Sequence, residues 1–263
     1  MPPKPAPTHF LCIPLVTPIS RPQLMQSLAS FHADVTSPTS FNIPDDAVRP
    51  VGTLHLTLGV FSFPSPPPAA ATAAAAKAIE LLQSLRLREI LADAAVTGAS
   101  TKADAGGVAR QRKAGERPLR ITLKGLHPMQ ASTPEKAAVL YAAPADDVGT
   151  LQAFCERVRG VFVQAGLMMV EGERPLLLHA TLVNTVYVKG KSRAGNGGKG
   201  KGRGKRWERL TIDARGVVER YEDQVWMKDV PVEGVAICKM GARKTVVGGV
   251  EDEAYEVVGE VAF

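Results

Sequence analysis

Two apolar stretches with the same polar interruption constrain the fold of this 263-residue chain more than any other feature. One reads TLHLTLGV and contains His55 and Thr57, and the other reads PLLLHATLVN and contains His179 and Thr181. Side chains alternate between the faces of a β-strand, so each His shares a face with its Thr while apolar residues take the opposite face. An unsatisfied buried polar group costs about 1–3 kcal/mol. We therefore expect both polar faces to be hydrated, hydrogen-bonded or in contact with a ligand.

The spacing of apolar residues predicts strands and helices in alternation through the first part of the chain. Strands are expected at 8–16, 53–61, 119–129, 136–145, 176–188, 234–241 and 253–263. Helices are expected at 21–35, 69–95 and 148–167, with a short one within 213–226. Residues 97–117 have almost no apolar side chains and are expected to form an exposed linker. This order suggests two related halves, each with its His-x-Thr strand after a helix.

The net charge of +6 is concentrated in one segment. Residues 189–206 read KGKSRAGNGGKGKGRGKR and carry +8, so the remainder of the chain sums to 6 − 8 = −2. With seven Gly and no aromatic residue, this segment is expected to be a disordered basic Gly-rich loop. It is either a solvated insertion between two strands or a segment that attracts RNA phosphates or directs nuclear import.

Composition excludes several classes of protein. No apolar run approaches the roughly 20 residues of a membrane-spanning helix, and the first ten residues lack the apolar region of a secretory signal. Cys12, Cys155 and Cys238 lack metal-site spacing and are expected to be buried thiols without disulfides. We expect an intracellular protein, nuclear or cytoplasmic, with no membrane contact.

The remaining histidines and two aromatic residues have weaker signals. His9, His32 and His127 do not share the His-x-Thr pattern and are expected to be structural or exposed. Tyr187 lies a few residues after the second motif, and Phe10 lies on the first expected strand. Each could stack a base or simply pack. No carboxylate or third His accompanies the motif histidines at ligand spacing, so no metal and no cofactor is expected.

Two imidazoles that face one another suit acid–base cleavage of a phosphodiester. A neutral His takes a proton from the attacking oxygen and a protonated His gives one to the leaving oxygen, which typically contributes about 10²–10⁴-fold. The Thr hydroxyls could donate to the non-bridging phosphate oxygens as charge develops there. The residues alone do not decide which His is the acid and which the base.

The two motifs resemble those of a known family. HLTL and HATL, with their histidines 124 positions apart, match the paired H-x-T-x signature of the 2H phosphoesterases. The flanks THFLCIPL, LHLTLGV, LHATLVNT and ICKMGA are similar to the branch that includes the A-kinase anchor protein nuclear-localisation-signal domain and activating signal cointegrator 1 complex subunit 1. The resemblance covers residues 8–263.

This resemblance implies a single domain over residues 8–263 with a bilobal α+β, LigT-like fold. Two pseudo-symmetric lobes of antiparallel sheet, with outer helices, would flank a central groove. It places His55, Thr57, His179 and Thr181 at the active-site positions of a phosphodiesterase of the hydrolase class.

The same resemblance implies a substrate class. Family activities include opening 2′,3′-cyclic phosphates, cleaving 2′-5′ linked oligoadenylates and trimming RNA 3′ ends. The expected partner is therefore an RNA or nucleotide substrate bound by a monomer. The alternative is a non-catalytic nucleotide- or RNA-binding module, or a subunit of a cointegrator-like complex.

Overall fold

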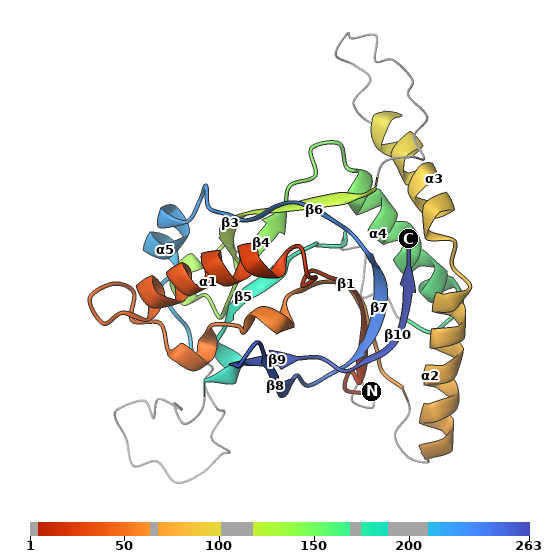
Figure 1. Cartoon of the computed structure of the whole chain (residues 1–263), viewed down its shortest axis with the longest axis horizontal. Coiled ribbons are helices and arrows are strands. Elements are labelled where there is room, and N and C mark those ends of the chain that lie inside the picture. Colours follow the sequence, from red (N-terminus) through yellow and green to blue (C-terminus); the bar gives the residue numbers. More distant parts are fainter. Residues whose placement is uncertain (1–4, 64–67, 101–117, 169–174, 189–209) are drawn as a thin grey trace.

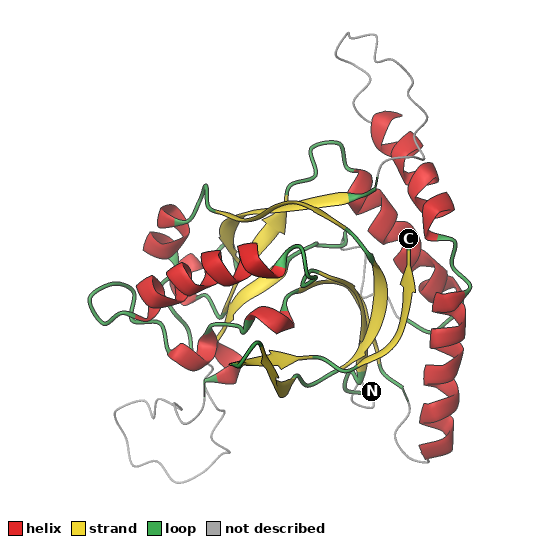
Figure 2. Ribbon diagram, viewed as in Figure 1, coloured by secondary structure: helices red, strands yellow, loops and turns green. Residues whose placement is uncertain are grey.

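The computed structural model describes residues 5–63, 68–100, 118–168, 175–188 and 210–263 (Figure 1). Within these ranges the strands form two four-stranded sheets and a separate two-stranded hairpin. All strand pairs are antiparallel. Figure 2 shows how strongly the strands curl. The bilobal α+β architecture expected from the sequence is confirmed.

The first sheet has the strand order β10-β7-β1-β2. Its strands are β1 (His9–Pro14), β2 (His55–Phe61), β7 (Gly234–Lys239) and β10 (Val257–Ala262). The first His-x-Thr motif lies on β2, at one edge of this sheet. The sheet therefore joins the start of the chain to its last strands.

The second sheet has the order β5-β4-β3-β6. Its strands are β3 (Arg120–Pro128), β4 (Val139–Pro144), β5 (Ala180–Asn184) and β6 (Val225–Pro231). The second motif lies at β5, again an edge strand, with His179 immediately before the strand begins. Since β2 and β5 contact each other, the edges that carry the two motifs meet.

The helices cover the outer faces of the sheets. They are α1 (Arg21–Thr36), α2 (Pro68–Gln83), α3 (Leu87–Ser100), α4 (Thr150–Gln164) and α5 (Arg215–Arg220). Helix α1 packs against β6, α2 against β10, α5 against β3, and α3 against α4. Figure 1 shows α2, α3 and α4 together along one flank, with α5 on the opposite flank.

The core lies on the faces opposite the motif histidines. Leu56 and Leu58 of β2 are fully buried, as are Ala180 and Leu182 of β5. Each of these residues alternates with the polar residues of its motif. The alternation read from the sequence is therefore confirmed, and it fixes which face of each edge strand presents its His and Thr.

The prediction of one long helix at 69–95 is wrong, because two helices occupy this region. Helix α2 ends at Gln83 and α3 begins at Leu87, without Gly or Pro between them. The two helices pack on different partners, β10 and α4, so tertiary contacts account for the break. Helix α3 also reaches Ser100, so the first four residues of the expected linker are helical. The rest of that linker and all of 189–206 lie outside the described residues.

The strands at the end of the chain also differ from expectation. The short helix expected within 213–226 is confirmed as α5, but Trp226 and Met227 are buried in β6, a strand that was not expected. A hairpin of β8 (Arg243–Val247) and β9 (Val250–Ala254) precedes β10, where one strand was expected to begin at 253. The strand expected at 176–188 is shorter, and a 3-10 helix, Thr185–Tyr187, follows β5.

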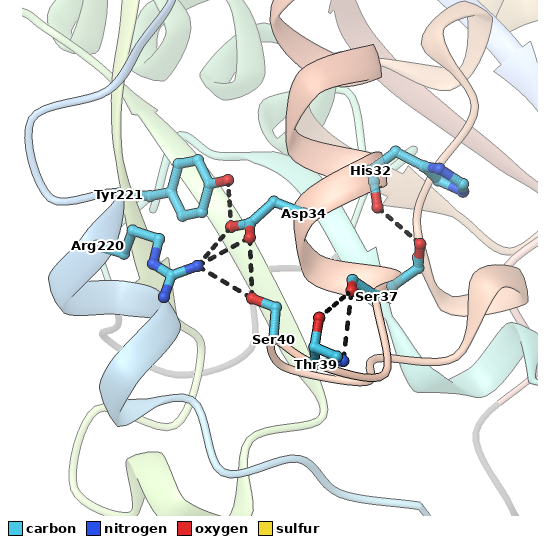
Figure 3. A network of polar contacts seen from close by, with 8 residues as sticks. His32, Asp34, Ser37, Thr39, Ser40, Arg220 and Tyr221 are labelled. Atoms are coloured by element: carbon cyan, nitrogen blue, oxygen red, sulfur yellow. Dashed lines mark hydrogen bonds and ion pairs between the residues drawn. The ribbon is translucent and has the colours of Figure 1, made fainter.

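A polar network joins α1 to α5 (Figure 3). The carboxylate of Asp34 accepts hydrogen bonds from Arg220 Nη1 at 2.8 and 2.9 Å, from the Tyr221 hydroxyl at 2.8 Å and from the Ser40 hydroxyl at 2.9 Å. Burial by itself would raise the pKa of Asp34, but the hydrogen bonds from Tyr221, Arg220 and Ser40 lower it on balance. This network fixes α1, the helix that packs against β6, and lies apart from the two motifs.

The three cysteines are buried and form no disulfide, as expected. Cys12 and Cys238 lie on the neighbouring strands β1 and β7, with their sulfur atoms 3.9 Å apart. In the described part of the chain, no helix combines the length and apolar character needed to cross a membrane.

Candidate active site

The first motif histidine lies among aromatic rings. The imidazole of His55 is 4.6 Å from the ring of Phe10 and 5.3 Å from that of Tyr255, measured between centroids. Tyr255 meets it edge-on and also contacts Phe10 at 4.9 Å. Phe10, which the sequence left between base stacking and packing, packs on His55 and is buried.

Both motif histidines are oriented in the same way by the backbone. Nδ1 of His55 lies 2.8 Å from the carbonyl oxygen of Thr53, and Nδ1 of His179 lies 2.9 Å from that of Leu177. A carbonyl oxygen only accepts hydrogen bonds, so Nδ1 must carry the proton in each ring. In the neutral ring this leaves the Nε2 lone pair free to accept a proton.

The environment of His55 favours its neutral form. Its pKa is lowered from 6.5 to about 4, mainly by burial; the hydrogen bond to Thr53 opposes this shift, and the charges of His179 and Arg49 contribute to it. The two motif histidines lie on the edge strands that contact each other, β2 and the start of β5. With this pKa, His55 is unprotonated at neutral pH.

The second motif histidine has an aromatic neighbour of its own. Tyr141 on β4 is the cross-strand partner of Thr181 on β5, and its ring meets His179 edge-on at 5.4 Å. His127, which is exposed as expected, also contacts Tyr141, with ring centroids 5.5 Å apart. Burial raises the pKa of Tyr141, so its hydroxyl stays protonated.

The two threonines occupy equivalent places. Thr57 lies opposite Cys12 on β1, and Thr181 lies opposite Tyr141 on β4. Both are half-buried, on the same faces as their histidines. The structure thus brings all four predicted residues to the two meeting edges.

The other two histidines have local roles, as expected. Nδ1 of His9 contacts the hydroxyl of Thr8 at 3.0 Å, and Nε2 of His32 lies 2.7 Å from a carboxylate oxygen of Asp45. Neither belongs to the environment of the two motif histidines.

Arg49 is a residue of this region that the sequence did not indicate. Its side chain is only 6% exposed, and its charge acts on His55. Its backbone N–H donates to the carbonyl of Leu182, next to Thr181, at 2.8 Å. A lone Arg in a proline-containing loop carries no sequence signal, since pairing between this loop and β5 is a tertiary feature. Tyr141 and Tyr255 were missed for the same reason.

The β8–β9 hairpin holds the Arg49 loop in place. The carboxylate of Asp252 accepts from the backbone N–H of Gly52 at 2.9 Å and from Arg21 Nη1 at 2.8 Å. A Cβ on Gly52 would overlap the backbone oxygen of Glu253, so this close approach requires glycine. The hairpin leads directly to Tyr255 and so sets its position beside His55.

Metal-ligating side chains do not gather here. Across the described ranges, no three His, Cys, Asp or Glu side chains converge as a metal site would require. A cavity of about 420 Å³ between α1 and β6, lined in part by Ser27, Tyr221 and Trp226, lies away from both motifs.

Comparison with known proteins identifies the family. The family model of the AKAP7 2′5′ RNA ligase-like domain matches residues 7–263. An uncharacterized protein of Schizosaccharomyces pombe is 28% identical over 129 residues, which cover 49% of this chain and about half, 52%, of that relative. Two crystal structures are similar over 97% of each chain: a phosphoesterase (TM-score 0.46, 16% identity) and E. coli LigT complexed with 3′-AMP (TM-score 0.44, 15% identity). Because the family model spans nearly the whole chain, this protein belongs to the AKAP7 2′5′ RNA ligase-like domain family, which confirms the 2H phosphoesterase relationship expected from its paired H-x-T-x motifs.

Proposed function

We propose that this protein is a metal-independent phosphodiesterase that cleaves a phosphodiester in RNA ends or in small 2′,3′-cyclic or 2′-5′ linked nucleotides. Family membership supports phosphoesterase-type activity in broad terms. One observation carries the finer proposal. His55 and His179, on meeting sheet edges, each bind a backbone carbonyl through Nδ1 and keep Nε2 for proton transfer.

The environment of His55 suits the role of general base. With a pKa of about 4 it is neutral at pH 7 and can take a proton from the attacking water or hydroxyl. A bound phosphate would favour the protonated form and raise this pKa towards neutrality, where a base is more effective. His179 then donates a proton to the leaving oxygen.

The threonine hydroxyls complete the proposed site. Thr57 and Thr181 lie on the faces that carry the histidines, where each could donate a hydrogen bond to a non-bridging phosphate oxygen. Negative charge that builds on these oxygens in the transition state would then be stabilised without further rearrangement.

The test is mass spectrometry of products formed in the presence of EDTA. The substrates are 2′,3′-cyclic nucleotides, 2′-5′ oligoadenylate, and RNAs ending in a hydroxyl, a phosphate or a cyclic phosphate. We expect His55→Ala and His179→Ala each to slow consumption of one of them by about 10²–10⁴-fold. His32→Ala is the matched control, since His32 pairs with Asp45 away from the motifs.

Each outcome has a defined meaning. Wild-type rates in both motif variants would overturn the proposal, as would a requirement for added metal. Binding of AMP to folded wild-type protein without turnover of any substrate would instead support the non-catalytic binding module.

The basic segment 189–206 adds a separate element to the proposal. Its eight positive charges would attract RNA phosphates without reading sequence. Deleting it should weaken RNA binding and flatten its salt dependence, while the turnover of mononucleotides stays unchanged. Equal salt dependence with and without the segment would contradict this role.

A further inference from the structure

Arg49 carries a buried charge with incomplete pairing. Its side chain is 6% exposed, and its Nη2 lies 3.5 Å from Glu253 Oε2. Within the described residues this nitrogen has no hydrogen-bond partner. Taking a guanidinium out of water costs several kcal/mol unless its donors are satisfied. The residue that pairs with it, Glu253, is one-third exposed, so its carboxylate can be hydrated when it is not paired with Arg49.

The backbone places Arg49 between the two motifs. Its N–H bonds the carbonyl of Leu182, and its neighbour Val48 pairs with Val183, so the loop runs alongside β5 just after Thr181. Six residues later the same loop becomes β2 at His55. The guanidinium is thus tied by short stretches of chain to both sheet edges.

Two tyrosines hold the guanidinium in position. The carbon at its centre lies 3.6 Å from the centroid of the Tyr187 ring, in stacking contact. The ring of Tyr255 contacts His55, and Tyr187 and Arg49 both act on the pKa of the Tyr255 hydroxyl. Burial is the main cause that raises the pKa of Tyr255 to about 12, so this hydroxyl stays neutral beside the cation. A guanidinium fixed in this way loses little freedom when it binds an anion.

These contacts define a cationic group that is held rigidly, is short of one hydrogen bond and lies beside the motif histidines. A planar guanidinium matches the oxygens of phosphate, which can accept two parallel N–H donors. We propose that Arg49 binds the phosphate group of the substrate at the two-histidine site, and that Glu253 forms its ion pair with Arg49 only while no phosphate is bound. The proposal rests on the proposed function for the identity of the anion. It makes Glu253 a competitor of the substrate.

The competition predicts opposite effects for the two members of the ion pair. Removing the guanidinium in Arg49→Gln should weaken phosphate binding by about tenfold or more, which corresponds to one charge-assisted hydrogen bond. Removing the competing carboxylate in Glu253→Gln should strengthen binding several-fold. Arg49→Lys keeps the positive charge but loses the planar guanidinium with its parallel N–H donors. Its phosphate affinity should lie between those of wild type and Arg49→Gln.

The experiment is isothermal titration calorimetry with inorganic phosphate, and then with AMP, at pH 8 and fixed ionic strength. At this pH His55 is neutral and phosphate is a dianion, so the charge of Arg49 dominates the measured difference. The matched control is the exposed pair Arg86 and Glu89, whose atoms are 3.1 Å apart. Arg86→Gln and Glu89→Gln should leave affinity unchanged.

A purely structural ion pair gives a different pattern. In that case Arg49→Gln and Glu253→Gln would move affinity in the same direction or leave it unchanged, and either result would overturn the proposal. If Arg49→Gln does not fold by circular dichroism, Glu253→Gln still decides, because unchanged or weaker binding in this variant contradicts the competition.

Turnover separates this inference from the proposed function. Wild-type protein that binds phosphate in the expected order of variants, yet cleaves nothing, would leave Arg49 as an anion-binding residue and remove the catalytic role. Cleavage by wild type with an unchanged kcat/KM in Arg49→Gln would retain the enzyme and reject the role of Arg49.

Discussion

The ring of Phe10 covers the imidazole of His55, with 4.6 Å between the two centroids. This contact joins the first strand of the chain to the first motif. It also excludes water from one side of a residue whose pKa is set mainly by burial. Phe10, a side chain that has no polar atom, thus contributes to the burial that lowers the pKa of His55.

Replacing Phe10 with Ala should therefore raise the pKa of His55 from about 4 towards its ordinary value of 6.5. The ring would gain hydration, which stabilises the charged imidazolium. An NMR titration of the imidazole protons measures this directly. Phe41→Ala is the control, since Phe41 stacks under Arg220 away from the motifs. A His55 pKa that stays at about 4 in Phe10→Ala would show that burial by Phe10 is not the cause.

The low pKa of His55 makes the fold sensitive to acid. Below pH 6.5 the unfolded chain protonates this residue while the folded protein does not, so stability falls as the pH drops from 6.5 towards 4. The stability attributable to His55 should decrease by on the order of 3 kcal/mol between pH 7 and pH 4. Over this pH range we expect the stability of His55→Gln to fall by about 3 kcal/mol less than the stability of wild type. Urea denaturation of both proteins at each pH is the measurement, and parallel losses would refute the assignment.

Gly52 and Gly160 should respond in opposite directions to alanine. A Cβ on Gly52 would overlap the backbone of Glu253, so Gly52→Ala should destabilise the protein by about 1–3 kcal/mol and displace the hairpin. At Gly160, within α4, a Cβ meets nothing within 4 Å, and Gly160→Ala should stabilise by up to about 1 kcal/mol. Chemical denaturation gives both values. If Gly52→Ala is as stable as Gly160→Ala, the hairpin moves to accommodate the added Cβ without any loss of stability.

The Asp34 network should show strong coupling between its members. Asp34 accepts from Tyr221 and Arg220 at the same carboxylate, so the hydrogen bond from Tyr221 involves a charged partner. A double-mutant cycle with Asp34→Asn and Tyr221→Phe should give a coupling energy of about 1 kcal/mol. Urea unfolding of the four proteins measures it. Because the network lies apart from the motifs, phosphate affinity should remain at the wild-type level in both single variants, and additive losses of stability would argue against direct coupling.

Much of the fold follows from patterns that are local in the sequence. The alternation around His55 and around His179 predicted which residues are buried, and the apolar spacing within 21–35 predicted α1, where Leu24, Leu28 and Phe31 are buried. These signals reflect the periods of the strand and the helix themselves, so they do not depend on partners that are distant in the chain.

The features that were missed depend on contacts between distant segments. Val225 follows Tyr221 at helical spacing, yet it begins a strand because β3 offers a partner for pairing. Arg49 is positioned by a backbone hydrogen bond to Leu182, which is more than 130 positions away in the chain. The basic segment and most of the expected linker lie outside the described residues, so those expectations stay predictions.

The order of strands has a consequence for how the protein is made. β6 completes the second sheet, whereas β7 and β10 complete the first, and all three come from residues after Gln224. Until that stretch has been made, β1 lacks its neighbour β7 and β3 lacks its neighbour β6, so neither sheet is complete. Because both sheets depend on the same stretch of chain after Gln224, the two halves of the site are expected to form together, once that stretch has been made.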